Sequence, residues 1–296
     1  MCRFIGYLGS KLVLADLISR PENSLIRQSY KARERPEPLN GDGFGVGWYT
    51  PEITDEPSVF TSITPAWSNR NLLNLAQHVR SGCFFAHVRA ASPGMTVSES
   101  NCHPFRYGRF LWMHNGTIAG FRQLKRRLRA SLPDELYHAI EGTTDSEHAL
   151  MVFLNFLGSK NALATAADLA EALVKTIRQF EDWEMEAGID QPSIYNFAVT
   201  DGRDMAAVRY VSDPLIEPIS LYFSKPGKYL CCDGRAEILD CGCDRESGII
   251  VASERLTDQR ELWTRVAPNH IITIDAGFNV NIHLLPDPGK KLRTAI

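Results

Sequence analysis

Two helical segments lie between two groups of β-rich segments, and this order constrains the fold more than any other feature of the chain. Apolar residues recur at helical spacing over residues 146–157 and 164–180, separated by Gly158-Ser159. Short β-rich runs precede these helices, and five more follow them, at residues 193–201, 206–211, 220–224, 248–253 and 270–275. Strands, paired helices and then strands again favour an α+β fold of packed layers over alternating βαβ units.

The first half of the chain supplies the remaining expected elements. They are a strand at 2–9, a helical patch at 12–18, an amphipathic helix at 69–80, a strand at 83–92, a hairpin at 105–118 that ends in an Asn-Gly turn, and a helix from Phe121. No repeat, low-complexity tract or proline-rich linker divides the chain. We therefore expect one domain over residues 2–296, with residues 257–296 as C-terminal strands that complete it.

Charge and hydropathy argue against two classes of partner. The net charge is -3 and the pI is near 6.3, so no general basic excess is available to neutralise nucleic-acid phosphates. No apolar run reaches the roughly 18 residues of a membrane span, and the N-terminus lacks the layout of a secretory signal. The seven cysteines are odd in number and form no disulfide framework, which predicts a reducing compartment and a cytoplasmic location.

Two local patterns resemble ligand sites without matching them. Cys231-Cys232 and Cys241-x-Cys243 lack the two-residue gaps of zinc knuckles and have no nearby histidine, so we expect structural thiols and no metal. The glycine-rich segment 39–50 matches neither common phosphate-loop pattern. Its alternating apolar residues predict a strand with close backbone neighbours instead.

Cys2 is the candidate nucleophile. If Met1 is removed, Cys2 carries a free α-amine beside its own thiol, and the unperturbed pKa of such an amine is about 8. The amine can then take the thiol proton and later give it to a leaving amine, as N-terminal threonine does in related chemistry. The strand that follows would hold a terminus that otherwise frays.

Partners for such a nucleophile are found elsewhere in the chain. In MHNGT, the Asn115 side-chain amide and the Gly116 N–H are able to donate to one oxyanion, although Asn-Gly is also a common turn. Arg89 in HVRAAS presents a fork that fits a carboxylate, with a surface or strand ion pair as the alternative. Asp145 in GTTDSE is suited either to a substrate ammonium or to capping the helix that follows.

In order along the chain, Met-Cys, GDGFGVGWY, FAHVRAAS, ESNCHPF, HNG, TTDSE and VASERL together resemble the class-II glutamine amidotransferases. The similarity spans about residues 2–256 and is nearest to the stand-alone branch that includes γ-glutamyl amide hydrolases of thiol metabolism. It implies an N-terminal-nucleophile fold, a four-layer αββα sandwich of two β-sheets between helices. It also implies hydrolysis of the γ-amide of glutamine or of a γ-glutamyl compound through a Cys2 thioester.

The resemblance implies a role for each matching residue. Cys2 is the nucleophile, and Asn115 and Gly116 form the oxyanion hole. Arg89 binds the substrate α-carboxylate with the help of Ser92, and Asp145 binds the α-ammonium. The motif histidines His87 and His114 are expected to give packing or hydrogen-bond support, and no chemical role is derived for His103. Ser253-Glu254 in VASERL is expected to form a structural turn. This chemistry requires no metal or organic cofactor.

The chain departs from the better-known members in two ways. They place a tryptophan directly after the clamp arginine, where this chain has Ala90, so the loop that closes over the substrate is expected to differ. No synthase domain is expected after the glutaminase region, so any ammonia acceptor would be a separate synthetase subunit. The alternatives left open are a glutaminase subunit, an independent γ-glutamyl amide hydrolase, and a catalytically silent module that binds glutamine or a γ-glutamyl compound.

Overall fold

The computed structural model describes residues 2–34, 39–91, 96–158, 164–239 and 247–286. Seven of its strands form the larger sheet: β1 (Arg3–Val13), β2 (Phe44–Thr50), β3 (Thr54–Ser62), β4 (Arg80–Val88), β9 (Tyr222–Ser224), β12 (Gly248–Ala252) and β13 (Trp263–Arg265). Their order across this antiparallel sheet is β13-β9-β12-β1-β4-β2-β3. The N-terminal strand β1 is therefore central.

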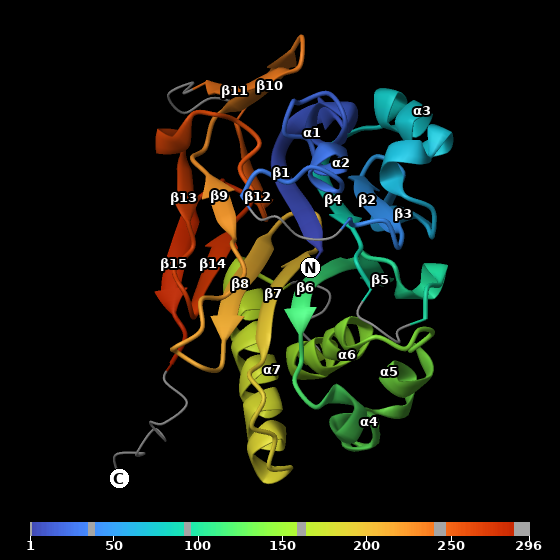
Figure 1. The fold of residues 1–296 in the computed structure, drawn as a ribbon, viewed down its shortest axis with the longest axis vertical. Helices are drawn as coiled ribbons and strands as arrows, with labels where there is room; N and C mark the ends of the chain where they lie inside the picture. The colour runs from blue at the N-terminus through green and yellow to red at the C-terminus, as the bar shows by residue number, and fades with distance from the viewer. Residues whose placement is uncertain (1, 35–38, 92–95, 159–163, 240–246, 287–296) are drawn as a thin grey trace.

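A second sheet lies against the first (Figure 1). It contains six strands: β5 (Phe105–Tyr107), β6 (Phe110–Thr117), β7 (Ile194–Thr200), β8 (Met205–Val211), β14 (His270–Ile274) and β15 (Val280–Leu284). The order is β15-β14-β8-β7-β6-β5. A separate hairpin is formed by β10 (Lys228–Cys232) and β11 (Arg235–Leu239). Two strands of the last forty residues, β14 and β15, thus extend the second sheet, while β13 forms an edge of the first.

Helices cover the outer faces of the two sheets. The larger sheet is covered by α1 (Ala15–Ile18), α2 (Leu25–Gln28) and α3 (Arg70–His78). The smaller sheet is covered by α6 (Asp145–Leu157) and α7 (Ala166–Glu186), and α4 (Phe121–Ala130) and α5 (Asp134–His138) pack against α6. Figure 1 shows α6 and α7 beside β6, β7 and β8, and α1 to α3 beside β1 and β4. This is the four-layer αββα sandwich that the resemblance implied.

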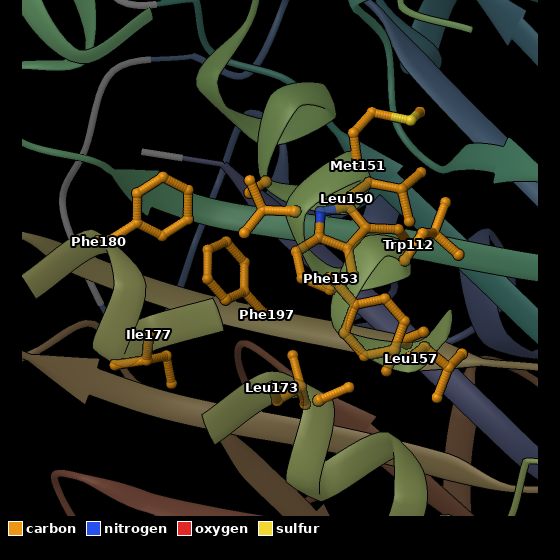
Figure 2. Close-up of a cluster of buried hydrophobic side chains, with 14 of the residues drawn as sticks. Trp112, Leu150, Met151, Phe153, Leu157, Leu173, Ile177, Phe180 and Phe197 are labelled. Atoms are coloured by element: carbon orange, nitrogen blue, oxygen red, sulfur yellow. The ribbon is translucent and has the colours of Figure 1, made fainter. Parts of the chain in front are cut away.

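Three apolar layers separate the four structural layers. One lies between the smaller sheet and its helices, where Trp112 and Phe197 meet Phe153 and Phe180 (Figure 2). The second lies under α1 to α3. The third lies between the sheets, and it contains Phe4.

Strand β1 is buried on both faces. Phe4 and Leu8 belong to the layer between the sheets, whereas Ile5 and Tyr7 belong to the outer layer under the short helices. Successive side chains of a strand point to opposite faces, and a strand covered on both sides needs no polar face. This explains why the N-terminal sequence is apolar without alternation.

The expected helices are present, with shifted boundaries. The helix expected at 164–180 begins at Ala166, where Thr165 and Asp168 form a capping box, and continues to Glu186. The patch expected at 12–18 is shorter, because Leu12 and Val13 belong to β1 and pair with β4. No helix in the described ranges is both long enough and apolar enough to cross a membrane.

Phe180 and Met185 of α7 provide a test of the helix-covered layer. Phe180 is fully buried and Met185 is 74% exposed. We expect Phe180→Ala to lower the free energy of unfolding by about 3–5 kcal/mol, because it removes a ring and leaves a cavity. Met185→Ala on the same helix should change it by less than about 0.5 kcal/mol. Urea denaturation of both variants measures the difference, and equal effects would contradict this assignment of the core.

Candidate active site

Cys2 lies directly before β1, and the pairing of that strand determines where its side chain points. Arg3 pairs with Val88 at the end of β4, which brings Cys2 beside the segment that follows β4. The Ala90 N–H donates to Cys2 Sγ at 3.4 Å, and the thiol donates to the Ala90 carbonyl at 3.6 Å. By alternation with Phe4, Cys2 is on the face of β1 that points between the sheets.

The Cys2 thiol is half-buried and protonated at rest. Burial raises its pKa, and the Ala90 N–H and the positive charge of Arg89 only partly oppose this effect. In the described part of the chain, the hydrogen bonds of the sulfur are both to Ala90. The thiol therefore needs a base to become a nucleophile, and none of the histidines within the described ranges is hydrogen-bonded to it.

Arg89 is a buried cation held by uncharged groups. Its side chain is 3% exposed. The guanidinium donates to the Asp42 carbonyl from Nη1 and to the Thr96 carbonyl from Nη2, each at 3.3 Å. Its hydrogen-bond partners in the described residues are thus backbone carbonyls and not carboxylates. A buried charge without a counter-ion is costly, so this guanidinium is suited to receive an anionic group from a ligand.

Asp42 was not identified as a site residue from the sequence. Its carbonyl accepts from the Arg89 guanidinium and its Oδ2 accepts from the Ala91 N–H at 2.8 Å. The backbone of Arg89 is held as well, through its N–H to the Gly43 carbonyl at 2.8 Å. The only sequence signal for this role was the position of Asp42 within GDGFGVGWY. Ser92, the proposed helper of Arg89, lies outside the described residues.

Asn115 and Gly116 lie in a strand, so the expectation of an Asn-Gly turn is wrong. They belong to β6, where they pair with Asn196 and Tyr195 of β7. A local turn preference is overridden here because β7 provides hydrogen-bonding partners through Thr117. Asn115 is fully buried, and its side-chain oxygen and nitrogen both lack a hydrogen-bond partner among the described residues. Such unsatisfied buried groups are rare and require an explanation.

Gly116 is required by its backbone conformation and by its neighbour. Its φ is +149°, and a Cβ at this position would lie 2.0 Å from the Ile194 carbonyl oxygen. A side chain would therefore push β6 away from β7 next to Asn115. The sequence at this position is fixed by close approach of two backbones.

Asp145 is the first residue of α6, but it does not cap that helix. Thr144 is the N-cap, and its side chain accepts from the Glu147 N–H. Asp145 Oδ2 accepts from the Ile118 N–H at 3.0 Å, and Oδ1 accepts from the Ser146 N–H at 2.8 Å. Since Ile118 follows Asn115 by three residues, Asp145 is tied to the end of β6.

Two motif histidines link the elements that carry these residues. His87 Nε2 donates to the His114 carbonyl at 3.1 Å, which connects β4 of one sheet to β6 of the other. His114 Nδ1 bonds to Ser146 Oγ at 2.8 Å, which connects β6 to α6. The His103 ring stacks on His87 with centroids 4.2 Å apart. The contacts of His87 and His114 agree with the packing or hydrogen-bond support expected for these two residues.

Buried histidines in this cluster are neutral. Burial lowers the pKa of His87 to about 3, with a further lowering from Arg89 and His114 and an opposing effect of the hydrogen bond to the His114 carbonyl. Burial also lowers the pKa of His103 and of His114. Among the described residues, no group of three or more His, Cys, Asp or Glu side chains is arranged to hold a metal ion.

The four-layer sandwich, with a cysteine at the start of its central strand, defines an N-terminal-nucleophile fold. The chain belongs to the class-II glutamine amidotransferases, whose family model matches residues 22–294. It is therefore an amidohydrolase-type enzyme, as the motifs predicted.

Three similar proteins illustrate this membership. "Probable glutamine amidotransferase DUG3" of Saccharomyces cerevisiae is 41% identical over 300 residues, covering 93% of this chain and 82% of the relative. "Gamma-glutamyl-hercynylcysteine sulfoxide hydrolase" of Mycolicibacterium smegmatis is 35% identical over 173 residues, covering 58% of this chain and 70% of the relative. The solved glutamine aminotransferase class-II domain protein of Silicibacter pomeroyi has 27% identity and a TM-score of 0.66, covering 96% of this chain and all of that one.

The neutral histidine cluster predicts a loss of stability in acid. The pKa of His87 is about 3 in the folded protein and about 6.5 in an unfolded chain. The unfolded state therefore binds more protons between these values, and the free energy of unfolding falls as the pH decreases below about 6.5. His87→Gln keeps a donor for the His114 carbonyl and should reduce this dependence. Urea denaturation between pH 7 and pH 4 measures both slopes, and parallel slopes would refute the assignment.

Proposed function

We propose that this enzyme hydrolyses the γ-amide bond of glutamine or of a γ-glutamyl compound through a thioester on Cys2. The observation that carries the proposal is the fully buried Asn115 amide, which has no hydrogen-bond partner in the part of the chain that the structure describes. It lies at the end of the layer between the sheets that Cys2 also faces. An unpaired donor in such a place is suited to an oxyanion that exists only during the reaction.

The first half of the reaction forms the thioester. With Met1 removed, the Cys2 α-amine takes the thiol proton, and the thiolate attacks the side-chain carbonyl carbon of the glutamyl group. The Asn115 Nδ2 and the Gly116 N–H donate to the oxyanion. When the tetrahedral intermediate collapses, the α-ammonium returns the proton to the departing nitrogen, and ammonia or an amine leaves.

The second half releases glutamate. Water gives a proton to the α-amine and attacks the thioester carbonyl, and the same two donors stabilise the second oxyanion. Collapse expels the thiolate of Cys2, which regains its proton from the α-ammonium. The α-amine of Cys2 thus accepts and returns the proton in each step, and no imidazole base is needed.

The substrate head group is held by residues of opposite charge. Arg89 binds the α-carboxylate through its fork, with the Ser92 hydroxyl assisting, and Asp145 binds the α-ammonium. The absence of a carboxylate partner for the buried Arg89 guanidinium in the described residues supports this assignment. A substrate without its ammonium would lose the charged contact with Asp145 and would bind more weakly.

The identity of the leaving group, ammonia or a larger amine, distinguishes two versions of the proposed function. Rapid hydrolysis of free glutamine by the isolated protein would favour a glutaminase that serves a separate ammonia acceptor. Activity restricted to γ-glutamyl peptides or conjugates would favour an independent hydrolase, as the name of the Mycolicibacterium smegmatis relative describes for that protein. The residues proposed to bind the glutamyl group are the same in both versions. Comparing the turnover of free glutamine with that of γ-glutamyl conjugates therefore decides between them.

Cys2 provides the direct test of the proposal. We expect a glutamine-like diazoketone to label Cys2 in protein whose Met1 has been removed, and Cys2→Ala to abolish both labelling and turnover. Cys232→Ala removes an exposed thiol and should preserve both, which makes it the matched control. Peptide mapping and intact-mass spectrometry identify the labelled residue. Turnover by the Cys2→Ala variant would exclude the mechanism, and substrate binding by the wild-type enzyme without turnover would indicate a silent binding module.

Asn115 tests the oxyanion hole separately from binding. Asn115→Ala should lower kcat by about 10²–10³-fold, the usual cost of losing one oxyanion donor, with little change in KM. Asn115→Asp keeps the size of the side chain and replaces the donor with a negative charge, so it should be at least as damaging. Steady-state kinetics with a γ-glutamyl substrate measure the effect, and a rise in KM at constant kcat would assign Asn115 to ground-state binding instead.

A further inference from the structure

Ser253 and Glu254, expected from the sequence to form a structural turn, lie directly after β12 and contact the first residues of the chain. Glu254 is fully buried, and its Oε1 accepts from Arg3 Nε at 2.9 Å. Its Oε2 accepts from the Arg33 N–H at 3.0 Å and the Glu34 N–H at 3.2 Å. One carboxylate thus holds β1 and the loop after α2 together.

The Arg3 guanidinium connects Glu254 to Cys2, the proposed nucleophile. Arg3 is 2% exposed, and its Nη1 donates to the Cys2 carbonyl at 3.0 Å. A first residue is attached by one peptide bond, so rotation about its Cα–C bond moves both the thiol and the amine. Fixing the carbonyl, together with the contacts of Sγ to Ala90, restricts that rotation.

Ser253 connects the same strand to the sheet that carries the oxyanion donors. Its Oγ accepts from the Phe4 N–H at 3.0 Å, and its N–H donates to the Phe4 carbonyl at 3.1 Å. Its carbonyl accepts from Ser220 Oγ at 2.9 Å, and the Ser220 carbonyl accepts from Asn196 Nδ2 at 3.1 Å. Asn196 is opposite Asn115 in the β6–β7 pair.

We propose that Ser253 and Glu254 are positioning residues for the reaction. Glu254 fixes the orientation of the Cys2 thiol and amine through Arg3, and Ser253 fixes β1 relative to the sheet that presents Asn115. The inference rests on the proposed role of Cys2 as nucleophile. It assigns a catalytic reason to a buried ion pair that the chemical steps themselves do not use.

A purely stabilising role has a different consequence from a positioning role. Breaking one partner of a buried pair is costly, whereas removing both charges together often restores stability. If the Arg3–Glu254 pair only stabilises the fold, stability and turnover should recover together when both charges are removed. If it positions Cys2, stability should recover and turnover should not, because removing the Arg3 guanidinium also removes the donor to the Cys2 carbonyl.

The test compares Glu254→Gln with the double variant Arg3→Met, Glu254→Gln. The double variant keeps a side-chain oxygen for the N–H groups of Arg33 and Glu34 and removes both charges of the Arg3–Glu254 pair. Relative to the single variant, its melting temperature should rise toward that of the wild type. Its kcat should remain about 10–100-fold low, the cost of a small displacement of reacting groups, and its KM should stay within about twofold because Arg89 and Asp145 are untouched.

Two further variants complete the test: one is a control for loss of stability alone, and the other tests positioning independently of Glu254. Asp201→Asn breaks the pair between Arg109 and the buried Asp201, 3.5 Å apart at the far end of the sandwich. It should lower the melting temperature without changing kcat. Ser253→Ala removes the acceptor for the Phe4 N–H and should lower kcat severalfold at constant KM, so it serves if Glu254→Gln does not fold.

Recovery of kcat together with the melting temperature in the double variant would overturn the inference, as would a rise in KM at unchanged kcat. Cys2→Ala is measured in parallel. If Cys2→Ala remains active, the proposed function itself fails. If it is inactive while the double variant turns over at the wild-type rate, the inference alone fails.

Discussion

Pairing of the N-terminal strand on both sides is the constraint on which the rest of the structure depends. β1 is hydrogen-bonded to β12 and to β4 in the centre of the larger sheet. This pairing holds an N-terminal segment that would otherwise fray. Alternation along the strand then directs Cys2 between the sheets. Without this pairing, neither the sulfur nor the neighbouring amine would have a defined position.

The layer between the sheets has different surroundings at its two ends. At one end are Cys2, Arg89 and Asn115, and the bond from His87 to the His114 carbonyl connects the sheets there. The middle is filled by close packing, and a Cβ on Gly6 would lie 2.9 Å from the Phe85 ring. At the other end, a cavity of about 460 Å³ opens beside Leu8, Cys83 and Asp201. The packed middle separates this cavity from the reacting groups.

Local sequence patterns predicted the elements whose structure is decided locally. Periodicity located α3 and α6 within about two residues and the start of α7, and ordered motifs identified the family. Asn115-Gly116 was assigned to a turn because the dipeptide prefers one, whereas pairing with the distant β7 decides its conformation. The role of Glu254 was unpredictable for the same reason, since its partner Arg3 is 251 positions away. The unpaired amide of Asn115 is likewise visible only in the folded protein.

The proposed head-group ligands and the reacting groups are neighbours in the same short segments. Arg89 precedes Ala90, whose N–H and carbonyl contact the Cys2 sulfur, and Asp145 accepts from the N–H of Ile118, just after the end of β6. A substrate that binds Arg89 or Asp145 therefore makes its contacts close to the Cys2 thiol or close to Asn115. Binding energy from the α-carboxylate and α-ammonium can then be used to align the reacting groups as well as to hold the substrate. In such an arrangement selectivity for the glutamyl head group and the rate of the chemical step depend on the same contacts.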